Sequence, residues 1–254
     1  MKILILAGDT DGNLGDLAIV TATCEAIRRQ VPGAEISIVS SRQNRDRERL
    51  KVRTIARGWR GLPRLAATAA SADLVICGGG GLFQDDDSRL KMPYWAVRLA
   101  ALRILSRQIA GFSIGAGPLD YRSSRFFASI ALRALDPVSV RDALARDVVA
   151  SLTKKRVHVV PDPAFMLQSS DTELADAALL DAGVPPRPTP CIGVAVRRWF
   201  HKHSSLVPYQ YASKFGIGKD RGRSEMSTYV DRVAAALDEV AATARAHIVF
   251  MPTY

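Results

Sequence analysis

The sequence has few of the features that assign a chain to a class quickly. Its 254 residues include three cysteines, Cys24, Cys77 and Cys191, whose spacing fits neither a disulfide framework nor a zinc site. We therefore predict buried thiols in a reducing compartment. No run of about 18 apolar residues occurs, so no membrane span is predicted. The amino-terminal apolar run is too short for a signal peptide core and an acidic loop follows it, which indicates a cytoplasmic protein.

Aromatic residues are also scarce, at 7% of the chain, whereas the net charge is +10. No nucleic-acid recognition motif or aromatic-studded basic sheet accompanies that charge. An anionic small substrate, a polyanionic glycan or a negatively charged membrane surface would fit it as well. A G-x-G-x-x-G dinucleotide fingerprint is absent. The acids at 85–87 are typical of a solvated loop, so no metal site is predicted.

What the sequence does contain is a series of strand–helix units, which predicts an α/β fold with a Rossmann-like parallel sheet covered by helices on both faces. The expected strands lie near Lys2–Ala7, Glu35–Val39, Leu74–Cys77, Gln108–Ile114, Pro137–Val140 and Val157–Val160. We place an amino-terminal lobe at 1–170, a helix and proline-rich linker at 171–190, and the start of a second Rossmann-like lobe at 191–254. We expect that second lobe to be truncated.

The most informative stretch is Asp73–Asp85, in which the apolar run Leu74–Cys77 leads into four consecutive glycines. The run is typical of a strand buried on both faces. Glycines permit positive φ and leave amide N–H groups uncovered, so a turn at that place suits an anionic or sugar-like ligand. Tight packing of the strand against a helix is the alternative interpretation.

Two other segments are predicted to reach the same edge of the sheet. Asn13, Gly15 and Asp16 follow the first strand, where the loop of an open α/β sheet faces a ligand. Asp16 could instead be a plain helix cap. Arg141 follows a short strand in Pro137–Asp142, where a guanidinium can clamp a carboxylate or phosphate. An ion pair with Asp142 is the alternative for Arg141.

Five motifs in register make the chain resemble the polysaccharide pyruvyl transferase family. They are N-x-G-D at 13–16, D-L-V-I-x-G-G-G-G-L-F-Q-D at 73–85, G-x-S-I-G-A-G-P at 111–118, S-V-R-D at 139–142 and V-P-D-P-A-F-x-L at 160–167. The resemblance implies a two-lobed fold like that of GT-B glycosyltransferases. It also implies transfer of pyruvate from phosphoenolpyruvate to a sugar of a cell-surface or extracellular polysaccharide, or of its lipid-linked precursor, as a cyclic ketal. It further implies an Arg–x–His motif in the carboxyl-terminal lobe, which we expect beyond residue 254 with no such pair in this part of the sequence, so we expect the catalytic set here to be incomplete.

On that resemblance we expect Arg141 and Arg197 to hold the phosphate and carboxylate of phosphoenolpyruvate. Asp16 and Asp85 are the candidates for gripping sugar hydroxyls or acting as base. His201 and His203 are alternative acids, although their surroundings favour an exposed loop, and Asp162 is typical of a turn at a hinge. Phosphoenolpyruvate is expected as donor substrate, without a cofactor. The remaining candidate substrate-binding residues are Asn13, Gly15, Gly79, Gly80, Gly81, Gln84, Gly115 and Ser139.

Other functions stay open at this point. The scaffold would suit a glycosyltransferase or a sugar-nucleotide epimerase, or a non-catalytic lobe that holds a glycan; a nucleic-acid binder rests on charge alone. The amphipathic segment Trp95–Arg107 could lie on a membrane that presents a lipid-linked acceptor, or serve only as a crossover helix on the sheet. A homo-oligomer is a further possibility.

Overall fold

The computed structural model describes residues 1–86, 88–184, 190–196 and 223–251, and it divides into two compact units. Unit 1 comprises Met1–Leu167 among the described residues, and unit 2 the described residues from Gln168 onward. The proline cluster at 185–189, Arg197, His201, His203 and Asp87 lie outside the described residues. No described helix is both long and apolar enough to cross a membrane.

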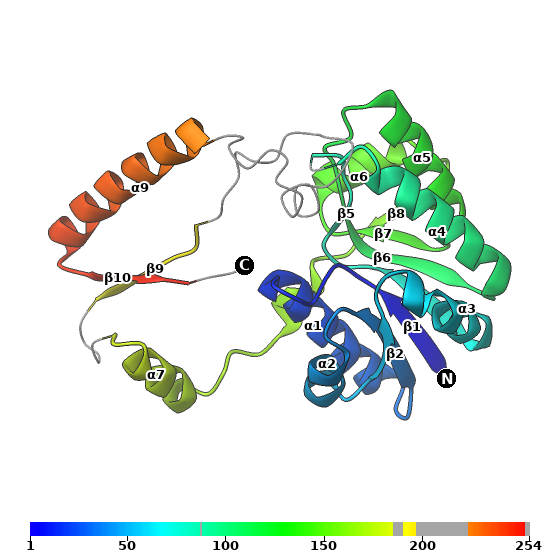
Figure 1. Ribbon diagram of the computed structural model, residues 1–254, viewed down its shortest axis with the longest axis horizontal. Coiled ribbons are helices and arrows are strands. Elements are labelled where there is room, and N and C mark those ends of the chain that lie inside the picture. The colour runs from blue at the N-terminus through cyan, green and yellow to red at the C-terminus, as the bar shows by residue number, and fades with distance from the viewer. Residues whose placement is uncertain (87, 185–189, 197–222, 252–254) are drawn as a thin grey trace. The chain divides into compact units, whose positions relative to one another are not determined.

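Unit 1 is built on one parallel sheet whose strands run in the order β3-β2-β1-β4-β6-β7-β8, with β5 paired to β6 (Figure 1). All described pairings in it are parallel, and β1 lies between β2 and β4. The six predicted strands are all found, and the predicted α/β Rossmann-like class is confirmed. The strands are β1 Lys2–Leu6, β2 Glu35–Ser40, β3 Arg53–Ala56, β4 Leu74–Gly78, β5 Gly81–Phe83, β6 Ile109–Ala116, β7 Val138–Val140 and β8 Val157–Val159.

Helices cover both faces of this sheet, and alternation along β1 shows how the two layers of the core are divided. Leu4 and Leu6 join the cluster that includes residues of α3, α4, α5 and α6, whereas Ile3 and Ile5 join the cluster that includes residues of α1 and α2. The helices are α1 Leu14–Gln30, α2 Gln43–Leu50, α3 Leu62–Ser71, α4 Lys91–Leu105, α5 Arg122–Arg133 and α6 Ala143–Ala150, with short 3₁₀ turns η1 Trp59–Gly61 and η2 Pro163–Met166.

The described residues of unit 2 form two helices and a pair of parallel strands. They are α7 Thr172–Asp181, β9 Cys191–Val194, α9 Arg223–Ala244 and β10 His247–Phe250. Asp171 caps α7 through its side chain, and Gly183 follows with φ of 78°, as expected for the end of this helix. Of the three cysteines, Cys24 and Cys77 are buried as predicted. Cys191 is exposed, and the prediction was wrong there because the first residue of β9 is open to solvent.

Candidate active site at the carboxyl ends of the sheet

The strand order puts a topological switch point beside β1, and we call the region at the carboxyl ends of the strands around it the crevice. From β1 the chain passes through α1 on one face of the sheet to β2, while from β4, the other neighbour of β1, it passes through α4 on the opposite face. Where the chain leaves two neighbouring parallel strands toward opposite faces of the sheet, the loops at their carboxyl ends separate. Ligands of open α/β sheets bind at such a place. Asn13–Asp16 lie at the end of the loop after β1 and in the first turn of α1, and Gly79–Gly81 lie between β4 and the start of β5, so these candidates lie at the same edge of the sheet.

The loop after β1 is organised by Asn13, which caps α1. Its side-chain oxygen accepts from the backbone N–H groups of Gly15 and Asp16, at 3.0 and 3.2 Å. The interpretation of Asp16 as the helix cap was therefore wrong. The Asn13 amide also donates to Oδ2 of Asp16 at 2.8 Å. Asn13 thus ends the loop and orients the Asp16 carboxylate.

The glycines after β4 allow that carboxylate to approach the backbone. Gly79 and Gly80 have φ of 78° and 80°, which disfavours any residue with a Cβ. A Cβ on Gly80 would lie 2.6 Å from Oδ1 of Asp16, and one on Gly8 would also collide with this carboxylate. Gly80 therefore serves two needs, a backbone conformation with positive φ and room for Asp16.

Arg141 reaches the same loop from the next strands. A Cβ on Gly115 would lie 3.1 Å from the guanidinium carbon of Arg141 and 2.8 Å from the carbonyl oxygen of Gly80. The predicted ion pair is present, because Nε of Arg141 lies 3.2 Å from Oδ2 of Asp142. The side chain nevertheless stays 42% exposed. The structure thus connects Asp16, Gly80, Gly115 and Arg141 through successive close contacts.

Burial raises the pKa of the Asp16 carboxyl to about 6. A hydrogen bond from the Asp9 backbone opposes this, the negative charge of Asp9 adds to it, and the positive charges of Lys91 and Arg57 lower the pKa. A carboxyl with this pKa can both give and take a proton near neutral pH. Asp16 is therefore the described acidic side chain of the crevice best suited to acid–base work.

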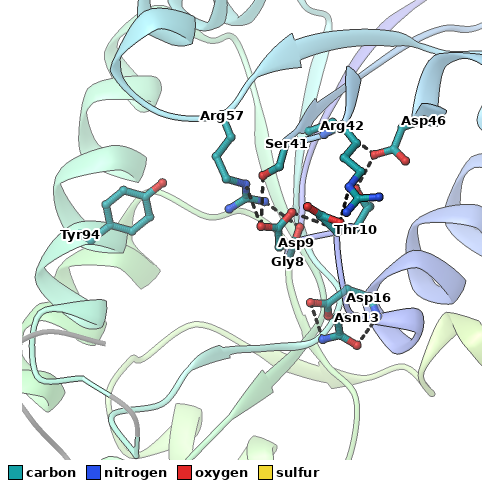
Figure 2. Close-up of polar contacts among 12 residues, drawn as sticks. Gly8, Asp9, Thr10, Asn13, Asp16, Ser41, Arg42, Asp46, Arg57 and Tyr94 are labelled. Atoms are coloured by element: carbon teal, nitrogen blue, oxygen red, sulfur yellow. Dashed lines mark hydrogen bonds and ion pairs between the residues drawn. The ribbon is translucent and has the colours of Figure 1, made fainter. Parts of the chain in front are cut away.

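Sequence reasoning missed two cations of this crevice, Arg57 and Lys91. Arg57 follows β3, donates to the Gly8 carbonyl at 2.9 Å, and lies 3.7 Å from an Asp9 oxygen that also accepts from Ser41, as Figure 2 shows. A basic residue directly after a strand was the available signal, but β3 has only four residues and was not predicted. Lys91 donates to the Gly81 carbonyl at 2.9 Å, and no sequence pattern announced that contact.

Other predicted residues have structural contacts. The Asp85 carboxylate is buried and accepts from the backbone N–H groups of Asp120 and Tyr121, each at 3.1 Å, so it anchors the loop before α5. The buried Ser139 hydroxyl donates to the Gly111 carbonyl and accepts from Ser113 N–H, both at 3.0 Å. The polar atoms of Asp85 and Ser139 therefore have backbone partners, and the substrate roles of both residues stay predictions. Gln84 lies against Gly81.

Asp162 and Gly15 lie at the starts of η2 and α1 and have local contacts. Asp162 caps η2 by accepting from Ala164 N–H at 3.0 Å, as expected for a turn former. Gly15 lies in the first turn of α1, and its nearest neighbour is the Asn13 side chain. Among the described residues, no three His, Cys, Asp or Glu side chains gather as a metal site would require.

The comparisons with known proteins agree with the position of these motifs. The family model for polysaccharide pyruvyl transferase matches residues 13–221. The chain belongs to this family. A search of the curated proteins finds no match.

Solved structures show the fold of this family member. A glycosyltransferase from Rickettsia africae ESF-5 aligns over 98% of the chain with a TM-score of 0.50 and 14% identity. The ADP-heptose LPS heptosyltransferase II of E. coli aligns over 84% of the chain with a TM-score of 0.36 and 15% identity. The chain spans 67% of the first protein and 60% of the second. The first likeness supports the α/β fold that the strand order already showed.

Unit 2 contains one Arg–x–His sequence, Arg245–Ala246–His247, so the expectation that this part of the sequence has no such pair was wrong. His247 is the first residue of β10, so it lies at the amino end of its strand. Ligands of parallel sheets bind at the opposite, carboxyl end. We therefore leave this pair out of the candidate site.

Proposed function

We propose that this protein transfers pyruvate from phosphoenolpyruvate to two hydroxyls of a sugar, forming a cyclic ketal. The observation that carries the proposal is one crevice holding the Arg141 guanidinium, a glycine-lined loop and a carboxyl whose pKa is about 6. Membership of the pyruvyl transferase family supports it. We further propose a sugar of a cell-surface polysaccharide or of its lipid-linked precursor as acceptor, and the cytoplasm as the place of reaction.

Donor binding would depend on cations and on uncovered backbone. Arg141 offers a fork of N–H donors that matches a carboxylate or phosphate. Lys91 and Arg57 add positive charge on the side of Asp16, and glycine amides leave room for a small anion to approach. Phosphoenolpyruvate carries both a carboxylate and a phosphate, so it has an anionic group for the guanidinium and another for the remaining positive charges and glycine amides. It is a substrate, and the scheme requires no cofactor.

The Asp16 carboxyl would move the proton that starts the reaction. Protonated Asp16 gives its proton to the methylene carbon of phosphoenolpyruvate, which leaves C2 electrophilic. One sugar hydroxyl adds to C2 and returns its proton to the Asp16 carboxylate. A second hydroxyl of the same sugar then displaces phosphate from C2, and its proton leaves with the phosphate. The products are the pyruvate ketal and inorganic phosphate, and Asp16 ends in its starting state.

Thermal unfolding of the full chain with phosphoenolpyruvate tests the donor site. Ligand at a hundred times its Kd adds about 2.7 kcal/mol to the free energy of unfolding, so the midpoint should rise by about 5 °C or more. Arg141→Gln should abolish the rise. Arg146→Gln, which removes an exposed arginine paired with Asp147 on α6, should leave it intact.

The same experiment with nucleotide sugars separates the main alternative. A rise with a uridine or guanosine diphosphate sugar and none with phosphoenolpyruvate would overturn pyruvyl transfer in favour of glycosyl chemistry. A rise with phosphoenolpyruvate that survives in Arg141→Gln would contradict the assignment of Arg141. Release of inorganic phosphate with a diol sugar would then test turnover directly.

A further inference from the structure

Three neighbouring helices on one face of the unit 1 sheet contain no acidic residue. Helices α3, α4 and α5 are described in full and hold one, three and three Lys or Arg residues respectively, without Asp or Glu. The opposite helix layer differs, because α1 and α2 together mix acidic with basic side chains. Among the described helices of unit 1, the excess of basic over acidic residues is therefore concentrated on α3, α4 and α5.

An apolar stripe runs along the outer side of α4 within this face. Tyr94, Val97, Ala101 and Ile104 are exposed at spacings of three and four residues, which places them in one row on the helix. Ile104 is 85% exposed and Val97 is 68% exposed. The inner side of α4 is occupied by Trp95, Leu99 and Leu102 in the core. The exposed apolar residues of the outer stripe therefore have no part in packing α4 against the sheet.

Arginines flank that stripe. Arg103 and Arg107 are exposed, and Arg98 stacks over the rings of Tyr94 and Trp95, with its guanidinium carbon 5.6 and 5.5 Å from the ring centres. Neighbouring α5 adds the exposed pair Arg122 and Phe126. Apolar side chains framed by arginines are the composition of a surface that lies in the headgroup region of an anionic bilayer.

We propose that the outer face of α3, α4 and α5 binds the surface of a membrane containing anionic lipids. Two other occupants fit the charges less well. A symmetric second copy would place arginines against arginines, with no acid on these helices to pair them. Nucleic acid would satisfy the arginines but would gain nothing from Val97 and Ile104.

The position of α4 connects this surface with the crevice. Its first residue, Lys91, donates to the Gly81 carbonyl at the glycine loop, so α4 starts beside the candidate site, and the helix runs away from it (Figure 1). A lipid-linked acceptor held in that membrane would be presented next to Asp16 and Arg141. This last step rests on the proposed function, whereas binding to the membrane does not.

Flotation of the full chain with lipid vesicles tests the surface without any use of catalysis. Vesicles of phosphatidylcholine with 30% phosphatidylglycerol should bind the chain about tenfold or more better than pure phosphatidylcholine, since each arginine near such a surface contributes about fivefold. Binding should fall by about tenfold in Ile104→Glu and at least as much in Arg103→Glu/Arg107→Glu. Raising the salt concentration should weaken binding of the wild type.

Matched controls come from the opposite face. Phe165→Glu alters an 88% exposed apolar residue on η2, which packs against α1, and Arg47→Glu alters an exposed arginine on α2. Both should bind anionic vesicles like the wild type. Equal binding to neutral and anionic vesicles, or equal losses in the controls, would overturn the proposal. A dimer in light scattering that Ile104→Glu converts to a monomer, without vesicle binding, would assign the surface to a second copy instead.

Discussion

Oδ1 of Asp16 lies too close to Gly80 for any residue with a Cβ atom to fit at position 80 without a shift. A Cβ there would be 2.6 Å from that oxygen, and Gly80 also has φ of 80°. Two segments separated by more than sixty residues of sequence therefore depend on each other. The contact gives Gly80 a definite task within the four-glycine run, which is to leave room for the Asp16 carboxylate.

Gly80→Ala should consequently lower both stability and donor binding, whereas backbone strain alone would lower stability only. We expect a loss of about 1–2 kcal/mol in the free energy of unfolding, together with loss of the midpoint rise caused by phosphoenolpyruvate. Gly33→Ala is the matched control, since Gly33 has the same φ of 80° and nothing within 4 Å of a Cβ. It should be destabilised to a similar degree and keep the rise. Equal ligand responses in the two variants would contradict the role of the Asp16 contact.

Asp16→Asn should make stability less dependent on pH. The folded pKa of about 6 lies above the ordinary 3.8, so folding favours protonated Asp16. That contribution is complete below about pH 4 and is lost as the pH rises through 6. In denaturant titrations, the variant should match the wild type near pH 4 and exceed it by about 1 kcal/mol at pH 7.5, a value reduced for the partial exposure of Asp16. A constant difference at every pH would contradict the raised pKa.

Asp85→Asn should separate a loop anchor from a catalyst. The amide keeps one acceptor oxygen and turns a donor toward the backbone N–H of Asp120 or Tyr121. We expect a loss of about 1–3 kcal/mol in the free energy of unfolding and an unchanged response to phosphoenolpyruvate below the unfolding transition. Calorimetric titration with phosphoenolpyruvate measures that response. Unchanged stability with abolished donor binding would instead support the predicted substrate role of Asp85.

Ser139→Ala should weaken the junction of two family motifs. Its hydroxyl connects Gly111 and Ser113 across the irregular register between β6 and β7. Removal leaves a buried carbonyl and a buried N–H with one partner fewer, at a cost of about 1–3 kcal/mol. Ser129→Ala removes an exposed hydroxyl that donates to the Phe126 carbonyl and should cost about 0.5 kcal/mol or less. Urea denaturation of both variants measures the two losses of stability. Equal midpoints would contradict a stabilising role of the Ser139 hydroxyl.

The sequence by itself determined the fold class and the rim of the crevice. Short apolar runs such as Lys2–Leu6 and Leu74–Gly78 have the length of buried strands, and the glycines that follow indicate where these strands end. Parallel strands send all their carboxyl ends to one edge, so Asp16, Gly80 and Arg141 could be expected together. Strand β3 was missed although the shorter strands β7 and β8 were predicted, because Arg53–Ala56 lacks the alternating valines of those two strands.

Only the tertiary structure decided what each polar side chain does. Asp85 and Ser139 stand in motifs beside the site, yet their bonds go to backbone groups that sequence spacing does not bring near. Arg57 enters the crevice because β3 pairs with β2 at the far end of the order, a long-range choice of neighbours. The pKa of Asp16 likewise depends on burial by the loops around it and on charges from other elements. Local propensity acts over a few residues, whereas these properties arise from packing between distant ones.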